Sequence, residues 1–175
     1  MNRENICCFT GHRHIKSETL PSLSAELYKT VYGLIQEGYK KFLCGGALGF
    51  DTLAAQAVLQ AKEVAPHISL HMVLPCKDQS RRWTDAQRKV YEEILSKSDE
   101  VSYIAEQYEA GCMHKRNRYL IEHAGCVIAY MERATGGTHY TVNYAQKLNI
   151  PIIYMQVGNA RVHQLSLDEY EQSLS

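Results

Sequence analysis

The sequence of 175 residues lacks an excess of either charge, because 19 Lys and Arg residues balance 19 Asp and Glu residues. This balance removes the usual electrostatic reason to expect a dedicated DNA-binding or membrane-surface protein, so any anion site must be local. The sequence also lacks an apolar run near the roughly 18 residues that span a bilayer, and a signal-peptide pattern at its start. We therefore expect a cytoplasmic chain without a membrane partner.

Several catalytic and metal-binding motifs are missing as well. No segment matches the P-loop, the full G-x-G-x-x-G dinucleotide fingerprint or the G-x-S-x-G nucleophile turn. The six cysteines form no C-x-x-C pair and four lie in or beside apolar runs, so we expect small, reduced, hydrophobic side chains. His12 with His14, and Cys112 with His114, supply two ligands each, which is too few for a closed metal site, so none is predicted.

What the chain does contain is a regular alternation of two patterns. Apolar runs typical of strands occur at 6–9, 41–44, 69–74, 100–104, 126–130 and 152–155, and helical periodicity separates them. The alternation predicts one α/β domain over residues 1–175, with its core at about 6–155 and a terminal helix at about 166–174. We expect a three-layer sandwich around a mainly parallel, doubly wound sheet of about six strands. The continuous apolarity of 126–130 predicts a central strand that is covered on both faces.

Three strand-to-helix turns are rich in glycine and threonine: Thr10–Arg13, Gly45–Gly49 and Thr135–Thr138. In an open parallel sheet these turns lie at the same edge. Glycine lets a backbone approach a ligand closely, and the helix start that follows adds partial positive charge. The three turns together predict a phosphate-binding edge.

Charged and aromatic residues near these turns allow two interpretations each. The carboxylate of Asp51 either accepts a ribose hydroxyl or caps its own helix. Lys115, Arg116 and Arg118 within one helical turn either clamp a phosphate or form a solvated helix face. Trp83, after two arginines, either offers a stacking surface or packs against the domain.

Four segments, Cys8–Arg13, Cys44–Asp51, Arg116–Arg118 and Gly136–Thr138, follow one another in a characteristic order. In this order they resemble the YpsA-like branch of the SLOG superfamily, which also holds DNA-processing protein A and the Lonely guy-type phosphoribohydrolases. The resemblance covers about residues 6–155. It implies a Rossmann-like domain that binds nucleotides or nucleotide-derived ligands at the glycine-rich edge.

The sequence departs from the phosphoribohydrolases at one important position. Their P-G-G-x-G-T-x-x-E pattern ends in a catalytic glutamate, and alignment on Gly137-Thr138 places Thr141 there. The hydrolase activity is therefore not carried over, and the sequence leaves open whether the chain is an enzyme. The stretch from Arg116 to Thr141 is closer to the DNA-processing branch, which binds single-stranded DNA.

We expect a sensor-type domain for a small nucleotide-like ligand, with no further cofactor assigned. The predicted ligand-binding residues are Thr10, Gly11, His12, Arg13, Gly45, Gly46, Gly49, Asp51, Arg116, Asn117, Gly136, Gly137 and Thr138.

Two alternative functions stay open. One is hydrolysis of an N-glycosidic or phosphate bond in the same pocket, with Asp51 or Glu132 as acid or base. The other is single-stranded nucleic-acid binding, whose affinity would fall steeply with salt. The oligomeric state, including a homo-oligomer, also stays open.

Overall fold

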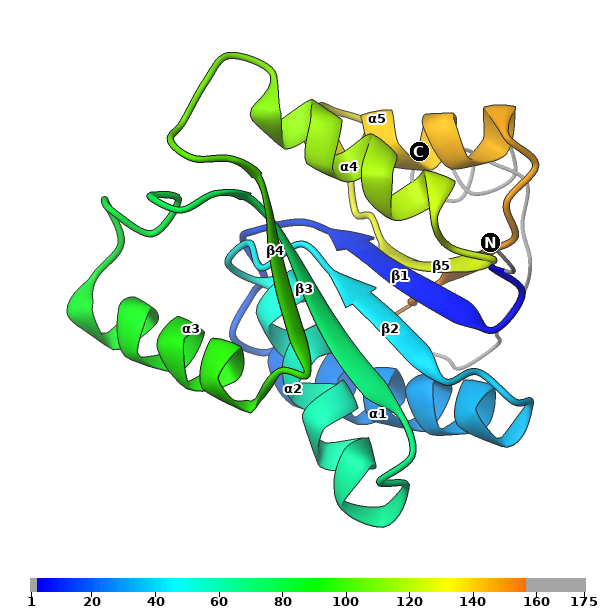
Figure 1. The fold of residues 1–175 in the computed structure, drawn as a ribbon. Coiled ribbons are helices and arrows are strands. Elements are labelled where there is room, and N and C mark those ends of the chain that lie inside the picture. Colours follow the sequence, from blue (N-terminus) through cyan, green and yellow to red (C-terminus); the bar gives the residue numbers. More distant parts are fainter. Residues whose placement is uncertain (1–2, 157–175) are drawn as a thin grey trace.

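Each apolar run of the sequence forms a strand within residues 3–156, the part of the chain that the computed structural model describes (Figure 1). The strands are β1 (Ile6–Gly11), β2 (Lys41–Cys44), β3 (Ser69–Cys76), β4 (Glu100–Ala105), β5 (Cys126–Tyr130) and β6 (Ile152–Tyr154). The helices are α1 (Leu20–Gln36), α2 (Phe50–Val64), α3 (Asp85–Lys97), α4 (Cys112–Glu122) and α5 (Gly136–Lys147). The predicted alternation is confirmed. The terminal helix predicted at 166–174 lies outside the described residues.

The strands form one sheet in the order β4-β3-β2-β1-β5-β6, and every neighbouring pair is parallel. The chain runs outward from β1 to β4, then crosses back to place β5 on the other side of β1. Cys8 therefore pairs with Leu43 on one side and with Val127 on the other. This reversal of direction between β1 and β5 is the place where open parallel sheets leave a crevice outside the carboxyl ends of their strands.

Helices cover both faces of the sheet, which confirms the three-layer, Rossmann-like sandwich. Helices α1, α2 and α3 lie on one face, and α4 and α5 lie on the other (Figure 1). The first interface buries the aromatic rings of Phe9, Phe42 and Phe50, and the second buries aliphatic side chains such as Leu43 and Leu120. Both interfaces remove apolar surface from water, and this burial is the main force that holds the layers together.

Local sequence signals explain where two of the helices lie. Thr84 precedes α3, its hydroxyl accepts from the N–H of Gln87 at 3.2 Å, and Gln87 Oε1 accepts from the N–H of Thr84 at 3.0 Å. This reciprocal pair is the capping box that the sequence predicts. In α2, Ala54 and Ala61 are fully buried, and such small side chains let the helix approach the sheet closely.

The expectation for the strand at 126–130 is confirmed in its coverage on both faces and wrong in its place in the sheet. Strand β5 is buried along its whole length, but it lies next to the β6 edge, and β2 and β1 occupy the middle of the sheet. Strand β5 is apolar because α4 and α5 cover one of its faces while the larger aromatic core covers the other.

All six cysteines are free and buried. Within residues 3–156, no helix combines the length and the apolarity that a membrane crossing requires.

Candidate functional site

A cleft of about 420 Å³ lies beyond the carboxyl ends of β1 and β5, where the strand order reverses. Such a crevice is the usual ligand site of an open α/β sheet. Its lining comes from the turns after β1, β2 and β5 and from one side of α4. The lining residues are Phe9, Thr10, Gly11, His12, Arg13, His14, Ala47, Asp51, Met113, His114, Arg116, Asn117, Leu120, Arg133, Thr135, Gly136, Gly137 and Thr138.

The turn after β1 depends on glycine for its packing. A Cβ atom on Gly11 would lie 2.4 Å from ring carbons of Phe50, the first residue of α2. The N–H of Phe50 donates to the carbonyl oxygen of His12 at 3.1 Å. Glycine at this position therefore lets the start of α2 pack directly under the turn that forms one wall of the cleft.

His12 links the turn after β1 to the turn after β5. Its Nε2 accepts from the backbone N–H of Arg133 at 3.2 Å, and its side chain is buried. Burial lowers the pKa of His12, and the nearby Arg133 charge lowers it further. A neutral imidazole can accept this hydrogen bond, so the lowered pKa and the geometry agree.

The first turn of α5 presents its backbone to the cleft. Within the described residues, Thr135 is an extended N-cap whose side chain makes no cap hydrogen bond, and the first turn contains no acidic residue. Gly136 has φ of +80° and open space where a Cβ would lie. The N–H groups of this turn lack a side-chain partner and carry the positive end of the helix dipole. This arrangement is typical of an anion site.

A buried ion pair stabilises the floor of the cleft. Asp51 Oδ2 lies 3.6 Å from Arg116 Nη1 and accepts from the N–H of Ala47 at 3.1 Å. Arg116 also donates to the carbonyl oxygen of Gly45. Burial raises the pKa of Asp51, while the Arg116 charge and the Ala47 N–H oppose this rise; burial also lowers the pKa of Arg116. The pair thus holds the Gly45–Gly49 turn against α4.

All the predicted ligand residues line the cleft except Gly45, Gly46 and Gly49. A Cβ on Gly49 would lie 2.2 Å from the carbonyl oxygen of Arg13, and one on Gly45 would lie 1.8 Å from Arg116 Nη1. Gly46, with φ of +67°, would meet Leu74 at 2.5 Å. The second glycine turn therefore supports the cleft from behind, and only Ala47 of this turn faces into it.

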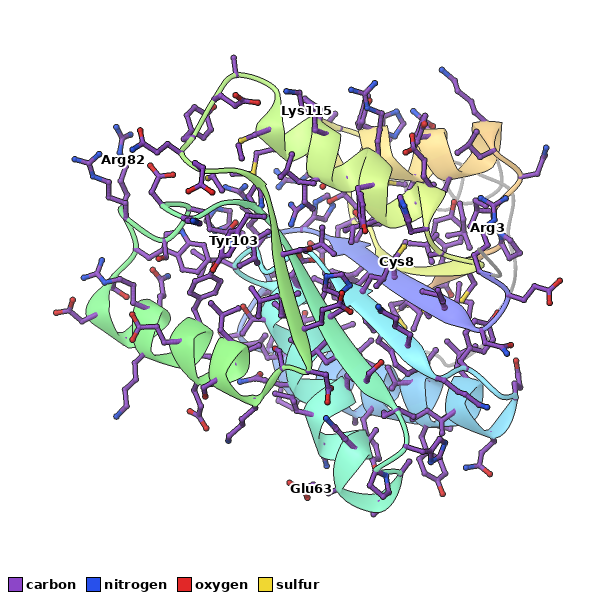
Figure 2. All side chains as sticks on the ribbon, in the orientation of Figure 1. Arg3, Cys8, Glu63, Arg82, Tyr103 and Lys115 are labelled. Carbon is purple, nitrogen blue, oxygen red and sulfur yellow. The ribbon has the colours of Figure 1, made fainter. Side chains whose placement is uncertain are left out.

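Two further groups from the sequence occupy unexpected places. Glu132 is exposed, accepts a hydrogen bond from the Tyr130 hydroxyl and does not line the cleft. The predicted basic cluster on α4 does not act together, because successive helical residues point about 100° apart. Lys115 pairs with Glu109 at 2.7 Å on the outer side of α4, and Arg118 is exposed, so only Arg116 reaches the cleft (Figure 2).

Arg133 is the main lining residue that the sequence analysis missed. It comes three residues after β5, at the same edge of the sheet as the glycine turns. This position in the sequence could have identified Arg133 as a lining residue. With Arg13 and Arg116 it gives the lining three arginines, against Asp51 as the one carboxylate among the described residues. A chain with no net charge thus concentrates positive charge at this cleft.

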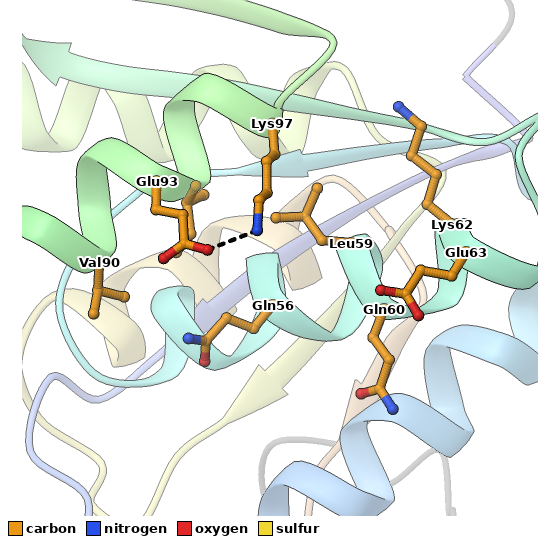
Figure 3. A pocket seen from close by; sticks show the side chains of 9 residues that line it. Gln56, Leu59, Gln60, Lys62, Glu63, Val90, Glu93 and Lys97 are labelled. Carbon is orange, nitrogen blue, oxygen red and sulfur yellow. Dashed lines mark hydrogen bonds and ion pairs between the residues drawn. The ribbon is translucent and has the colours of Figure 1, made fainter.

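Another cavity, of about 510 Å³, lies between α2 and α3 (Figure 3). Its lining consists of side chains from the two helices, including Glu93 and Lys97, which form an ion pair at 2.6 Å. No strand end or glycine turn from residues 3–156 lines this cavity, so the cleft at β1 and β5 is the stronger candidate. Within residues 3–156, no three His, Cys, Asp or Glu side chains are grouped to hold a metal ion.

Residues 7–157 match the sequence profile of the YspA SLOG family. The uncharacterized SPbeta prophage-derived protein YoqJ of Bacillus subtilis is 30% identical over 146 residues, which are 76% of this chain and 85% of that protein. A UPF0398 protein of Halalkalibacterium halodurans is 34% identical over 120 residues, which are 67% of this chain and 64% of that protein.

Two solved structures share the fold at low sequence identity. The first is DNA processing protein A from Helicobacter pylori, described with its single-stranded DNA binding mode. It has a TM-score of 0.67 and 19% identity, and the match covers 98% of this chain and 74% of that one. DNA processing protein A from Streptococcus pneumoniae has a TM-score of 0.64 and 17% identity, with 95% and 55% covered.

Proposed function

Because the chain belongs to the YspA SLOG family, we propose that its cleft binds a nucleotide or nucleotide-derived ligand, with a phosphate group at the first turn of α5. The observation that carries this proposal is the start of α5 itself. Its backbone N–H groups lack a side-chain cap and face a cleft that also contains Arg13 and Arg133. Backbone donors, a helix dipole and guanidinium groups together favour a phosphate.

The rest of the cleft suits the remainder of a nucleotide. Its volume of about 420 Å³ falls within the range of small-molecule sites. Thr10 and Asn117 add hydroxyl and amide groups that can hydrogen-bond a sugar or a base. Neutral His12 adds no charge to this part of the lining. The phosphate of a nucleotide would therefore lie beside arginines and the start of α5, and its sugar and base would lie beside uncharged polar side chains.

Binding without hydrolysis is the form of this function that the geometry favours. Asp51 is the one carboxylate among the described lining residues, and it already accepts from Ala47 and faces Arg116. Thr141, at the position of the phosphoribohydrolase glutamate, is buried and donates to the carbonyl oxygen of Gly137 at 2.8 Å. A hydrolase needs an acid or base with access to the substrate, and neither position offers one.

Calorimetric titration with a panel of nucleoside mono-, di- and triphosphates tests the proposal. Gly137→Val is the informative variant, because the nearest atom to a Cβ at Gly137 is Asn117 Nδ2 at 4.0 Å, so the larger side chain fits the fold but fills the cleft. Gly33→Val, on the exposed side of α1, is the matched control. Loss of nucleotide affinity in Gly137→Val alone supports the proposal. Equal affinity in both variants, or no binding by the unmodified chain, overturns it, and release of products would favour the hydrolase.

A further inference from the structure

A second cleft, of about 650 Å³, adjoins the first. Its lining residues are Arg13, Asp78, Gln79, Arg81, Arg82, Trp83, Gln107, Tyr108 and Met113. Arg13 and Met113 also line the first cleft, and Arg13 Nη2 lies 4.0 Å from Met113 Sδ. These two side chains therefore mark the boundary between two adjoining clefts.

The walls of the second cleft are tied to the sheet and to the first cleft. The loops after β3 and β4 are joined by a hydrogen bond from the N–H of Tyr108 to Asp78 Oδ1 at 2.8 Å. Gln79 Nε2 donates to the carbonyl oxygen of Gly46 at 2.9 Å, which fixes the β3 loop to the second glycine turn. Arg82 projects from this loop at the same end of the sheet as the turn that precedes α4 (Figure 2). A ligand that extends from the first cleft into the second would therefore meet loops that these hydrogen bonds already fix in place.

The lining of the second cleft combines positive charge with aromatic rings. Its three arginines face one carboxylate among the described residues, that of Asp78, which already accepts from Tyr108. Tyr108 is 66% exposed, and Trp83 is partly exposed with its ring edge-to-face against Tyr91, 5.1 Å between centroids. Guanidinium groups bind phosphates, and exposed aromatic rings stack on bases. Trp83 therefore both packs against the domain and lines the cleft.

We propose that the second cleft holds a second nucleotide unit of the ligand that occupies the first, so that the ligand consists of two nucleotides joined through phosphate. This inference rests on the proposed function. One phosphate lies at the first turn of α5 and another phosphate or the linkage lies at Arg13 on the boundary: these are the terminal and linking phosphates of a 5′-phosphorylated 3′–5′ dinucleotide, or the two linking phosphates of a 5′–5′ pyrophosphate dinucleotide. In either ligand the second base stacks between the loops that carry Trp83 and Tyr108. A 5′–5′ pyrophosphate dinucleotide and a 3′–5′ dinucleotide share this chemistry.

The native chain carries a reporter for this cleft, because Trp83 is the single tryptophan of the sequence. The experiment titrates the full chain with adenosine 5′-monophosphate, with two adenosines joined 5′ to 5′ through pyrophosphate, and with the 5′-phosphorylated dinucleotide pApA. Affinity comes from calorimetry, and occupation of the second cleft comes from Trp83 fluorescence. We expect at least one dinucleotide to bind about tenfold more tightly than the mononucleotide, as stacking of one more base predicts, and to change the fluorescence.

Two substitutions separate this inference from the proposed function. Tyr108→Ala removes an exposed ring on which the second base is proposed to stack, so it should reduce dinucleotide affinity toward the mononucleotide level and leave mononucleotide affinity unchanged. Tyr32→Ala removes an exposed ring outside both clefts and should change neither. The dinucleotide that gains affinity identifies the linkage. Equal affinity for mononucleotide and dinucleotides, without a fluorescence change, overturns the second subsite but leaves the proposed function intact. Dinucleotide binding that survives Gly137→Val overturns the shared ligand and the proposed function together.

Discussion

Arg116 and Asp51 form an ion pair of 3.6 Å between α4 and α2, and both side chains are almost completely buried. The pair joins the two helices on opposite faces of the sheet at the level of the cleft floor. Removing two charges from water costs several kcal/mol, so such a pair is maintained only where each partner gains further hydrogen bonds. Ala47 supplies one to Asp51 and Gly45 supplies one to Arg116.

Loss of either partner should therefore destabilise the fold strongly. Arg116→Met leaves a buried carboxylate without its partner, and we expect it to lower the free energy of unfolding by about 3–5 kcal/mol. The double variant Asp51→Asn with Arg116→Met should lose less than the sum of the single variants, with a coupling of about 1–3 kcal/mol. Urea unfolding of the three variants measures these values. Strictly additive losses would show that the two side chains do not stabilise each other.

Two glycines should respond in opposite ways to the same substitution. Gly49 has φ of +77° and would place a Cβ 2.2 Å from the Arg13 carbonyl, so Gly49→Ala should destabilise the chain by more than about 1 kcal/mol. Gly33 lies within α1 with open space around it, so Gly33→Ala should raise stability by about 0.5–1 kcal/mol. Thermal unfolding of both variants checks the pair. A stabilising Gly49→Ala would contradict the close approach of the two turns.

Stability should fall as the solution is acidified below pH 7. Burial lowers the pKa of both His12 and His71 in the folded chain, whereas each histidine of the unfolded chain binds a proton near pH 6.5. Below that pH the unfolded state holds more protons, so the free energy of unfolding falls, by up to about 1.4 kcal/mol per pH unit for each histidine. Urea unfolding between pH 5 and 7.5 (about the range in which histidine titrates) measures the slope. His12→Gln should flatten it, and exposed His14→Gln should not.

A carboxylate at the start of α5 should raise the stability of the fold and weaken nucleotide binding. Thr135 has the extended backbone of an N-cap but no side-chain cap bond within the described structure, so Thr135→Asp should stabilise α5 by about 0.5–1 kcal/mol. The same carboxylate would occupy the N–H groups proposed to bind phosphate and would repel an anion. We expect a higher melting temperature and weaker nucleotide binding. Unchanged affinity in this variant would place the phosphate elsewhere. Thr135→Asn supplies a neutral cap as the control.

The fold could be predicted because its signals are local. Apolar runs, the capping box at Thr84 and the glycines in the turns of β1, β2 and β5 all act within a few residues of one another. The general position of the site followed from one rule, that turns after parallel strands share an edge. The apolarity of 126–130 correctly predicted coverage on both faces, but this property does not determine whether a strand lies in the middle of the sheet.

The roles within the site depended on contacts that no local pattern contains. Gly45 and Gly49 resemble ligand-binding glycines in sequence, but the side chain of Arg116 and the backbone of Arg13 fill the space beside them. The directions of Lys115 and Arg118 depend on how α4 rotates against the sheet. The hydrogen bond between His12 and Arg133 joins residues 121 positions apart, so it appears only in the folded chain.

The pairing of β1 with β5 also determines when the cleft can exist. Strand β1 is first in the chain, but its partner on the cleft side begins at Cys126, and the pairing of Cys7 with Cys126 closes a loop that contains four helices and three strands. Contacts between such distant parts of a chain form slowly, because the entropy of closing the loop is lost before the contact stabilises it. A growing chain on the ribosome therefore has no complete cleft until the start of α5 has emerged. The proposed ligand would be bound only after synthesis and folding have passed this point.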